Sequence, residues 1–301
     1  MTGSISSSGI PPPPAVAGAS LEWHCGQRRP PIADRPLIMG ILNVTPDSFS
    51  DGGRFADPET AVAHGLRMFQ DGADIIDIGG ESSRPGAQPV SADEETARTQ
   101  PVIRELARRT DVLISIDTAK APVAAGALEA GAHIINDISA LTADQAMIGV
   151  ARSSGAGVIL MHMRGQPANM QHNPTYDDVV SEVLAYLRER RDAVTAAGIA
   201  ETALALDPGI GFGKTTAHNL QLLRRLPEFA AIGRPLLIGL SRKRFLGEIT
   251  GRDIQERQAA TTAALTWAIL AGARILRVHD VAAAADALRV VQSLREAPEP
   301  T

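Results

Sequence analysis

Eight short apolar runs, each ending in a polar residue, recur along the chain from residue 37 onward. The runs consist mainly of Leu, Ile, Val and Ala and do not alternate strictly with polar residues. This pattern is typical of parallel strands that are covered on both faces. The runs, each with the residues that end it, are Leu37–Leu42 with Asn43, Asp74–Ile78 with Gly79, Gly80 and Glu81, Val112–Ile116 with Asp117, His133–Ile135 with Asn136 and Asp137, Val158–Met161 with His162, Ala203–Leu206 with Asp207, Leu236–Leu240 with Ser241, and Ile275–Val278 with His279 and Asp280.

Longer segments between these runs have the pattern of helices. The segment Asp93–Arg109 begins with acidic residues and ends with two arginines, which suits the helix dipole. The other clear segments are Pro58–Gly72, Tyr176–Ala197, Ile254–Gly272 and Val281–Arg295. Eight consecutive strand–helix units predict an α/β fold of the (β/α)8 TIM-barrel class rather than an open sheet.

The two ends of the chain differ from this central region. Residues 1–20 are rich in Ser, Gly, Pro and Ala. We predict a disordered N-terminal extension there, because the segment has too little apolar surface to offset the entropy of ordering. Residues 21–36 predict a short hairpin that caps the barrel. No linker interrupts the apolar runs, so residues 37–296 are predicted as one catalytic barrel, followed by a tail at 297–301.

Composition narrows the function classes. The net charge is −5 and no long basic run occurs, which argues against nucleic acid or an anionic membrane as a partner. Aromatic residues make up only 3% of the chain, so the core must be aliphatic. We find neither a signal-peptide pattern nor an apolar stretch near the ~18 residues of a membrane span. Cys25 is the single cysteine, and a chain without an internal disulfide is expected in the cytoplasm.

Polar residues at the strand ends predict one ligand site. In a TIM barrel the loops after the strands surround a common mouth, so residues far apart in sequence converge there. A ring of donors and acceptors at this mouth is expected from Asn43, Glu81, Asp117, Asn136, His162, Asp207, Ser241, Lys243, Arg277 and His279.

The segment Asp207–Thr215 places an acidic residue between a buried strand and a Gly-rich loop. Its three alternate glycines would let the backbone come close to a flat or bulky group. A phosphate loop is excluded because Pro208 stands where that motif requires glycine. The plainer alternative is a Gly-rich turn with an aspartate that caps the next helix.

Two kinds of chemistry suit the ring. Asp117, Asn136 and Asp207 offer paired acceptors and donors for a heterocycle with N–H edges. Alternatively, they cap helices or pair with arginine. Arg277 and His279 are two residues apart and point the same way, at the strand 7–8 side where such barrels often bind phosphate. We therefore expect a phosphate or diphosphate ligand to bind there.

Two loops are too elaborate to be mere connections. One runs from Asn43 to Gly53 and the other from Glu81 to Ala87, and both are rich in Gly, Pro and Ser. Long loops in compact domains are usually lids or binding loops.

These loops also carry a family resemblance. The chain resembles the dihydropteroate synthases of the folate pathway, over Leu37 to about Arg295. The matching motifs are MGILNVTPDSFSDGG at Met39–Gly53, DIIDIGGESSRPGA at Asp74–Ala87, SIDT at Ser115–Thr118, INDIS at Ile135–Ser139, LDPGIGFGKT at Leu206–Thr215, SRKRFLG at Ser241–Gly247 and RVHDV at Arg277–Val281. Together they are highly specific, whereas each alone is weak.

The resemblance implies that p-aminobenzoate displaces diphosphate from 6-hydroxymethyl-7,8-dihydropterin diphosphate to give 7,8-dihydropteroate, with Mg²⁺ assisting. It implies a pterin pocket of Asp117, Asn136, Met161, Asp207, Phe212 and Lys243. The p-aminobenzoate side is expected to hold Phe49, Ser83, Arg84, Pro85 and Lys243. The diphosphate is expected to bind Asn43, Arg84, Arg277 and His279, with Asn43 also binding the metal. The expected catalytic residues are Lys243, Asp117, Arg277 and His279.

The sequence departs from the family pattern at two of these places. Ser83 stands where Thr is common, and Arg244 stands where Ser is common. The resemblance also implies a homodimer with small-molecule substrates and a sulfonamide-sensitive site. The alternatives are a pterin-binding methyltransferase barrel, which shares the pterin carboxylates, and a non-catalytic relative that acts as a binding protein.

Overall fold

The computed structural model describes residues 21–45, 58–82, 89–167 and 169–297. Within these residues each expected apolar run forms a strand. The strands are β1 (Leu37–Asn43), β2 (Ile75–Gly79), β3 (Leu113–Asp117), β4 (Ile134–Asp137), β5 (Gly157–Met161), β6 (Leu204–Asp207), β7 (Leu237–Gly239) and β8 (Ile275–Val278). β7 is shorter than the run Leu236–Leu240 because the chain turns after Gly239, where the Lys243 amide donates to the Leu240 carbonyl at 3.2 Å.

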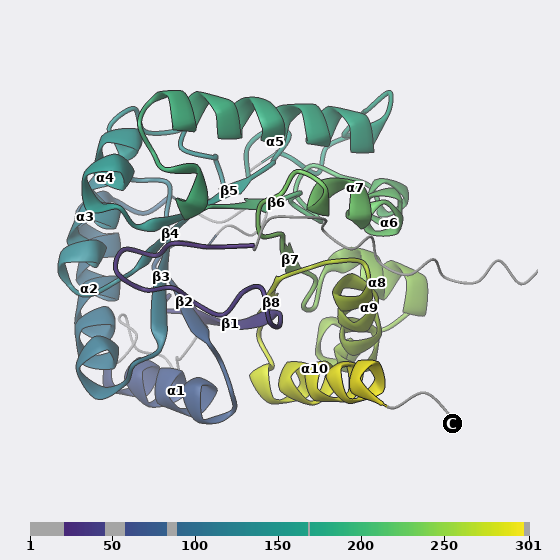
Figure 1. The fold of residues 1–301 in the computed structure, drawn as a ribbon, viewed down its shortest axis with the longest axis horizontal. Helices are drawn as coiled ribbons and strands as arrows, with labels where there is room; N and C mark the ends of the chain where they lie inside the picture. The colour runs from purple at the N-terminus through teal and green to yellow at the C-terminus, as the bar shows by residue number, and fades with distance from the viewer. Residues whose placement is uncertain (1–20, 46–57, 83–88, 168, 298–301) are drawn as a thin grey trace, which may run out of the picture.

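The strands form one parallel sheet in the order β6-β5-β4-β3-β2-β1-β8-β7. A parallel bridge between Leu206 and Leu236 joins β6 to the residue before β7. The two ends of the sheet therefore meet, and the sheet closes into a barrel. Figure 1 looks along this barrel, with the strands at the centre and the helices around them. The predicted (β/α)8 class is confirmed.

Helices cover the outside of the barrel on the described residues. They are α1 (Pro58–Gln70), α2 (Ala92–Arg109), α3 (Ala121–Glu129), α4 (Met147–Ser154), α5 (Val179–Ala196), η2 (Glu201–Ala203), α6 (Thr216–Arg224), α7 (Leu226–Ala230), α8 (Arg244–Thr250), η3 (Ile254–Glu256), α9 (Gln258–Leu270) and α10 (Val281–Glu296).

Two predicted helices have different bounds from those expected. The helix expected from Tyr176 begins at Val179, because the Asp178 side chain accepts from the amides of Val180 and Ser181 and so caps it. The helix expected over Ile254–Gly272 is divided into the short turn η3 and the longer α9. Apolar periodicity marks the buried face of a helix, but it does not mark the residue where a side chain caps the end.

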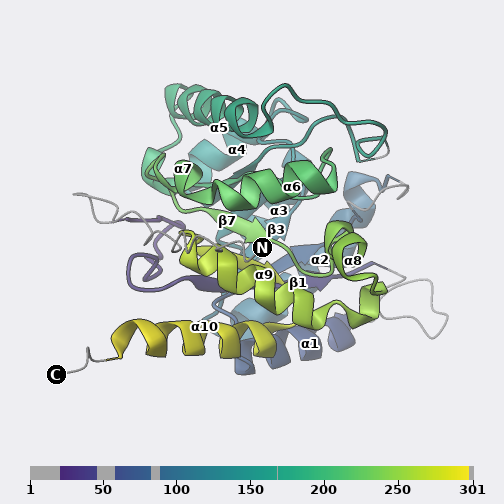
Figure 2. The same cartoon turned by 90° about the vertical axis from the view of Figure 1, so that its right-hand side faces the viewer.

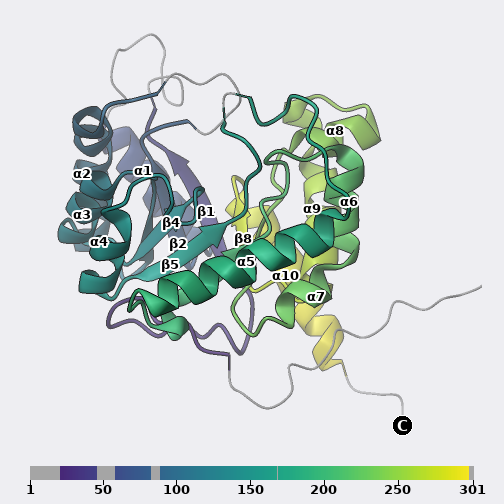
Figure 3. The same ribbon diagram turned by 90° about the horizontal axis from the view of Figure 1, so that it is seen from above.

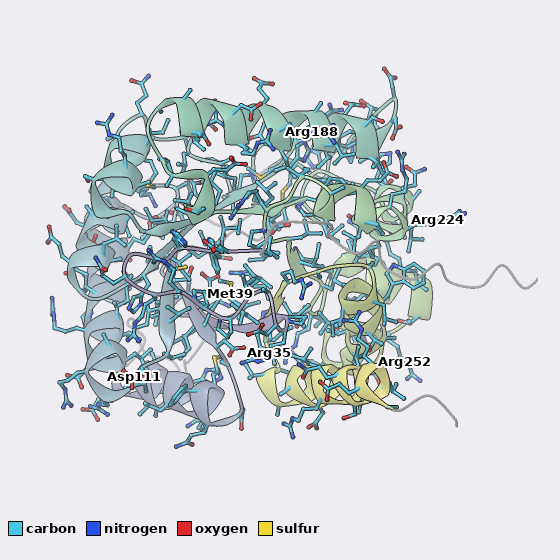
Figure 4. The ribbon with its side chains drawn as sticks, viewed as in Figure 1. Arg35, Met39, Asp111, Arg188, Arg224 and Arg252 are labelled. Atoms are coloured by element: carbon cyan, nitrogen blue, oxygen red, sulfur yellow. The ribbon has the colours of Figure 1, made fainter. Side chains whose placement is uncertain are left out.

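The inside of the barrel is filled by an apolar layer near the N-terminal ends of the strands. Side chains alternate between the two faces of a strand, so each strand contributes at least one inward residue to this layer. The cluster consists of Leu37, Met39, Ile75, Leu113, Ile134, Ile159, Ala205, Leu237 and Ile275, joined by Trp23, Cys25 and Ile32 from the segment before β1. In Figure 4 Met39 lies in the middle of the barrel, whereas the labelled Asp111 and Arg188 lie at the periphery.

The segment before β1 closes the N-terminal end of the barrel. Its chain folds back at an antiparallel bridge between Cys25 and Arg28, and Trp23 is 1% exposed. The Trp23 indole donates to the Ala203 carbonyl at 2.9 Å, which anchors the segment to the residue before β6. Figure 3 shows this purple segment at one end of the strands and α8 at the other. The opposite end is therefore left for the functional site. No helix of the described residues is long and apolar enough to cross a membrane.

Candidate functional site

A polar layer lies directly above the apolar layer in the barrel. Two residues further along five of the strands, the inward position changes from apolar to polar. The five residues are Asp77, Ser115, Asn136, Asp207 and Arg277. Because side chains two apart in a strand share a face, these groups all point into the barrel toward its C-terminal mouth. The alternation that places apolar side chains in the core therefore also brings these polar side chains together at the mouth.

Arg277 is the cation at the centre of this layer. Its Nε donates to Asp77 Oδ2 at 2.7 Å, and its Nη2 donates to Asp117 Oδ2 at 2.6 Å. Burial works to lower the pKa of Arg277, but the two carboxylates raise it overall. Burial raises the pKa of Asp117 above its usual range, against the lowering effect of Arg277. For Asp117, the plainer interpretation as a partner of arginine is therefore correct, at a position that also faces the mouth.

Asp77 belongs to this inward layer, and the sequence analysis did not assign it to the site. It is 0% exposed and accepts from Asn136 Nδ2 at 3.1 Å as well as from Arg277. Asp77 thus fixes the side chains of Asn136 and Arg277, two residues that were predicted for the site. A signal was present in the sequence, because an acidic residue inside an apolar run needs a buried partner.

Asp207 ends β6 and is 7% exposed. Its Oδ1 accepts from the Gly209 amide at 2.7 Å, which orients the carboxylate. Burial raises the pKa of Asp207, against the lowering effect of this hydrogen bond and of Lys243. Asp207 does not cap the next helix, since the N-cap of α6 is Thr215. Met161, which pairs with Asp207 in the sheet, is buried at 3% exposure and places a thioether beside it.

Two glycines of the Gly-rich loop pack against the backbone that follows β5. A Cβ on Gly209 would lie 1.8 Å from the His162 carbonyl oxygen, and one on Gly213 would lie 2.2 Å from that of Arg164. Both glycines have positive φ, at 67° and 61°. These two glycines therefore allow a close approach to the backbone after β5, whereas a Cβ on Gly211 would lie 3.1 Å from Lys243 Cδ.

Lys243 reaches the site from the turn after β7. Its Nζ lies 4.1 Å from the centre of the Phe212 ring, which brings both residues to the Gly-rich loop. Burial lowers the pKa of Lys243 to about 8, with Asp207 acting in the opposite direction. Arg257 donates to the carbonyl oxygens of Arg242 and Lys243, at 3.1 and 3.5 Å, and so holds the turn.

His279 and Asn43 lie one layer higher, at the mouth. His279 Nδ1 is 2.9 Å from Ser241 Oγ, which links the ends of β8 and β7. A Cβ built on Gly79 would lie 3.8 Å from both Asn43 Oδ1 and Asp117 Oδ2. These two oxygens therefore flank the same small space at the end of β2.

Glu81 and His162, two members of the expected ring, each bind a lysine that lies outside the ring. Glu81 forms an ion pair with Lys120, which also pairs with the buried Glu95 at 2.5 Å. His162 Nδ1 lies 3.0 Å from Nζ of Lys214, a residue that the sequence analysis did not assign to the site. Strand-end position alone does not tell whether a side chain faces the mouth or a neighbour, so a ligand contact by Glu81 or His162 stays a prediction.

A pocket of about 280 Å³ opens beside Lys243, between the loops after β6 and β7. Gly211 and Lys243 belong to both the pocket wall and the site described above. The lining residues are Gln171, Pro174, Gly211, Lys214, Thr215, Thr216, Asn219, Lys243, Arg244, Phe245 and Glu248. Four further predicted residues, Phe49, Ser83, Arg84 and Pro85, lie outside the described residues.

The predicted metal position can be tested against its donor set. On the residues that the structure describes, no group of three or more His, Cys, Asp or Glu could hold a metal ion. Mg²⁺ does not need such a cage, since it is usually held by one or two protein oxygens together with substrate phosphates and water. Asn43 Oδ1 and Asp117 Oδ2 are hard oxygen donors on one side of the mouth. This donor set fits Mg²⁺.

Comparisons with known proteins agree on one family. The profile of the family described as "Pterin binding enzyme" matches residues 39–279, from β1 to just past β8. The dihydropteroate synthase of Neisseria meningitidis serogroup C is 51% identical to this chain over 276 residues. The matched region covers 90% of this chain and 97% of that protein.

Two solved structures resemble the barrel closely. The dihydropteroate synthase of Xanthomonas albilineans in complex with 7,8-dihydropteroate matches with a TM-score of 0.84 and 46% identity. The Yersinia pestis dihydropteroate synthase with a sulfonamide drug complex matches with a TM-score of 0.87 and 45% identity. Each match covers 92% of this chain and 100% of the other.

Proposed function

Because this chain belongs to the dihydropteroate synthases, a family of pterin-binding enzymes, we propose that the residues at its barrel mouth carry out the family's condensation. The enzyme joins p-aminobenzoate to 6-hydroxymethyl-7,8-dihydropterin diphosphate and releases diphosphate, giving 7,8-dihydropteroate. The observation that best supports the residue roles is the inward layer around Arg277. Hydrogen bonds there join Arg277, which we propose for the diphosphate, to Asp117 directly and to Asn136 through Asp77.

The pterin is held by the deep half of the site. Asp207 accepts from the 2-amino group and the adjacent ring N–H. Asn136 forms hydrogen bonds with the neighbouring edge of the pterin ring. Lys243 donates to the carbonyl and ring-nitrogen side. Phe212 and Met161 supply the apolar faces that exclude water from the ring. The buried position of Asp207 supports this arrangement, because a carboxylate at 7% exposure needs donors on a ligand to be fully satisfied.

The diphosphate is held at the strand 7–8 side. The reaction breaks the bond between the pterin methylene carbon and the diphosphate oxygen. Arg277 and His279 stabilise the negative charge that grows on the leaving oxygen. Asp117 lies beside the pterin and favours the positive charge that the methylene gains. The amine nitrogen of p-aminobenzoate then forms the new C–N bond and releases a proton to water, so no dedicated base is required.

The p-aminobenzoate ring is proposed to enter beside Lys243. The pocket of about 280 Å³ opens there, and Arg244 lines it with an exposed guanidinium. That cation suits the carboxylate of the substrate. Phe49, Ser83, Arg84 and Pro85 complete this side in the proposal. The sulfonamide complex of the Yersinia pestis relative supports the same slot as the site of sulfonamide competition.

Mg²⁺ is proposed to bind at Asn43 together with the diphosphate oxygens. The ion would supply charge neutralisation for the leaving diphosphate. Asn43 contributes its amide oxygen, and Asp117 Oδ2 lies on the other side of the same space. The protein would need to supply few donors, because Mg²⁺ sites usually take most of their oxygens from substrate phosphates and water.

Incubating the purified protein with both substrates and Mg²⁺ tests the function. We expect one 7,8-dihydropteroate and one diphosphate for each pterin consumed, and we expect EDTA to abolish turnover until Mg²⁺ is added back. Chromatography and a diphosphate assay follow the two products. A methyltransferase barrel or a non-catalytic binding protein would release no diphosphate from this mixture.

We also propose a homodimer, formed through the face of α6, α8 and α9. Each of these helices carries a large exposed apolar residue, with Leu220 at 46%, Ile249 at 54% and Trp267 at 40% exposure. Figure 2 shows the three helices side by side on one face, and such a patch favours a self-complementary contact.

Light scattering should give twice the chain mass, and Ile249→Glu should give a monomer. A monomeric wild-type protein at high concentration would contradict the proposal.

The proposal places the enzyme in the cytoplasm. Cys25 is buried, and burial raises the pKa of its thiol, so it is a poor nucleophile for disulfide exchange. A chain whose single thiol stays reduced suits a reducing compartment. Cell fractionation that recovers the protein in the soluble cytoplasmic fraction checks this, and recovery with an extracytoplasmic fraction would contradict it.

A further inference from the structure

Lys214 is a buried residue of the Gly-rich loop. None of the roles assigned above involves it. It is 3% exposed. The chain contains only three lysines, Lys120, Lys214 and Lys243, although it has 29 basic residues in all. A buried lysine in such an arginine-rich chain needs a specific set of partners.

Four acceptors surround the Lys214 ammonium. Gly209 and Phe212 accept through their carbonyl oxygens, each at 2.9 Å. His162 lies at 3.0 Å through Nδ1 and at 3.4 Å through its carbonyl oxygen. An ammonium has three hydrogens to donate. All of them are therefore used within the protein, and Lys214 has none left for a substrate.

His162 is suited to be an acceptor in this cluster. Burial, together with the neighbouring charges of Lys214 and Arg164, lowers its pKa to about 3. The imidazole is therefore neutral at ordinary pH. Burial lowers the pKa of Lys214 to about 7. In its protonated form the lysine can only donate, so Nδ1 of His162 then carries the lone pair and Nε2 carries the proton. His162 immediately follows Met161, the last residue of β5.

The two loop residues whose carbonyl oxygens accept from Lys214 also contact Asp207 and Lys243, which we propose to bind the pterin. Gly209, whose carbonyl it binds, donates its amide to Asp207 Oδ1 at 2.7 Å. Phe212, whose carbonyl it also binds, places its ring 4.1 Å from the Lys243 ammonium. The ammonium therefore connects the end of β5 with the backbone of the Gly-rich loop after β6.

We propose that Lys214 is a positioning residue for the pterin, because it holds Gly209 and Phe212 where Asp207 and Lys243 can meet the pterin edge. This inference rests on the proposed function, since it assumes that Asp207 and Lys243 bind the pterin. Lys214 acts through these residues and does not touch the substrate.

Lys214→Met tests the proposal, because methionine keeps much of the length and removes every donor. We expect pterin affinity in calorimetry to fall by about 10- to 100-fold, the loss typical when a group that orients a binding residue is removed. The KM for p-aminobenzoate should change much less. Wild-type affinity in Lys214→Met would overturn the proposal.

Lys120→Met is the matched control. Lys120 is also tied into a partly buried network, with Glu81 and Glu95, but it lies at the start of α3 and not at the Gly-rich loop. We expect it to lower the Tm while pterin affinity is kept. An equal loss of pterin affinity in both variants would mean that general destabilisation is responsible, and would also overturn the proposal.

Two milder variants of His162 test the proposal if Lys214→Met does not fold. His162→Asn retains a side-chain acceptor for the ammonium, whereas His162→Leu removes it. We expect pterin affinity to be lower in His162→Leu than in His162→Asn, and equal affinities would contradict the proposal. Product formation by the wild-type protein is measured separately, so a failure of the proposed function is distinguished from a failure of this inference.

Discussion

Replacing Asp207 with alanine is expected to remove most of the affinity for the pterin. The variant would leave the donors of the pterin unpaired in a pocket where Asp207 itself is only 7% exposed. We expect a loss of about 2–5 kcal/mol in binding free energy, as for truncation of one partner of a buried charged pair. Isothermal titration calorimetry with the pterin measures this directly.

Asp137→Ala provides the control for this prediction. Asp137 is a buried carboxylate at the end of β4 that points away from Asn136, and it accepts from the amides of Ser139 and Leu141 at 2.7 and 3.1 Å. Its loss should lower stability but keep pterin affinity. If Asp207→Ala bound the pterin as the wild-type protein does, the assignment of the pocket would be wrong.

Arg277→Lys is expected to lower kcat by about 10²- to 10³-fold, the usual effect of losing one donor to a developing negative charge. A lysine keeps the charge but has a single ammonium. It cannot hold Asp77 and Asp117 with two nitrogens as Arg277 does, at 2.7 and 2.6 Å. Single-turnover kinetics with saturating substrates separate this loss in the chemical step from changes in binding.

Arg35→Lys is the matched control for Arg277→Lys. Arg35 binds both oxygens of Asp74, at 2.8 and 2.5 Å, just before β1 at the N-terminal end of the barrel. The same substitution there should leave kcat unchanged. A wild-type kcat in Arg277→Lys, or equal losses in both variants, would show that Arg277 does not act on the leaving diphosphate.

Much of the fold could be predicted because apolar runs and polar strand ends have a simple physical cause. Strands of a barrel are covered on both faces, so each appears as an apolar run, and the first polar residue after it lies at the mouth. Asp117, Asn136 and Asp207 were found in this way. The start of α5 was not, because a cap such as Asp178 depends on side-chain geometry and not on periodicity.

Other parts of the site could not be predicted from strand position alone. Whether Glu81 faces the mouth or pairs with Lys120 depends on a helix that begins 40 residues later in the chain. Asp77 was hidden inside an apolar run, although its charge was a signal. Lys214 was hidden in a motif whose glycines were interpreted as a ligand contact, whereas Gly209 packs against the His162 carbonyl.

A crystal structure of the protein with 7,8-dihydropteroate is the most direct test of the central claim, that the inward polar layer of this barrel is the condensation site. We predict that the pterin ring lies within hydrogen-bond distance of Asp207, Asn136 and Lys243, and that the p-aminobenzoyl group extends past Lys243 toward Arg244. A product molecule bound elsewhere, with Asp207 making no hydrogen bond to the pterin, would contradict the account.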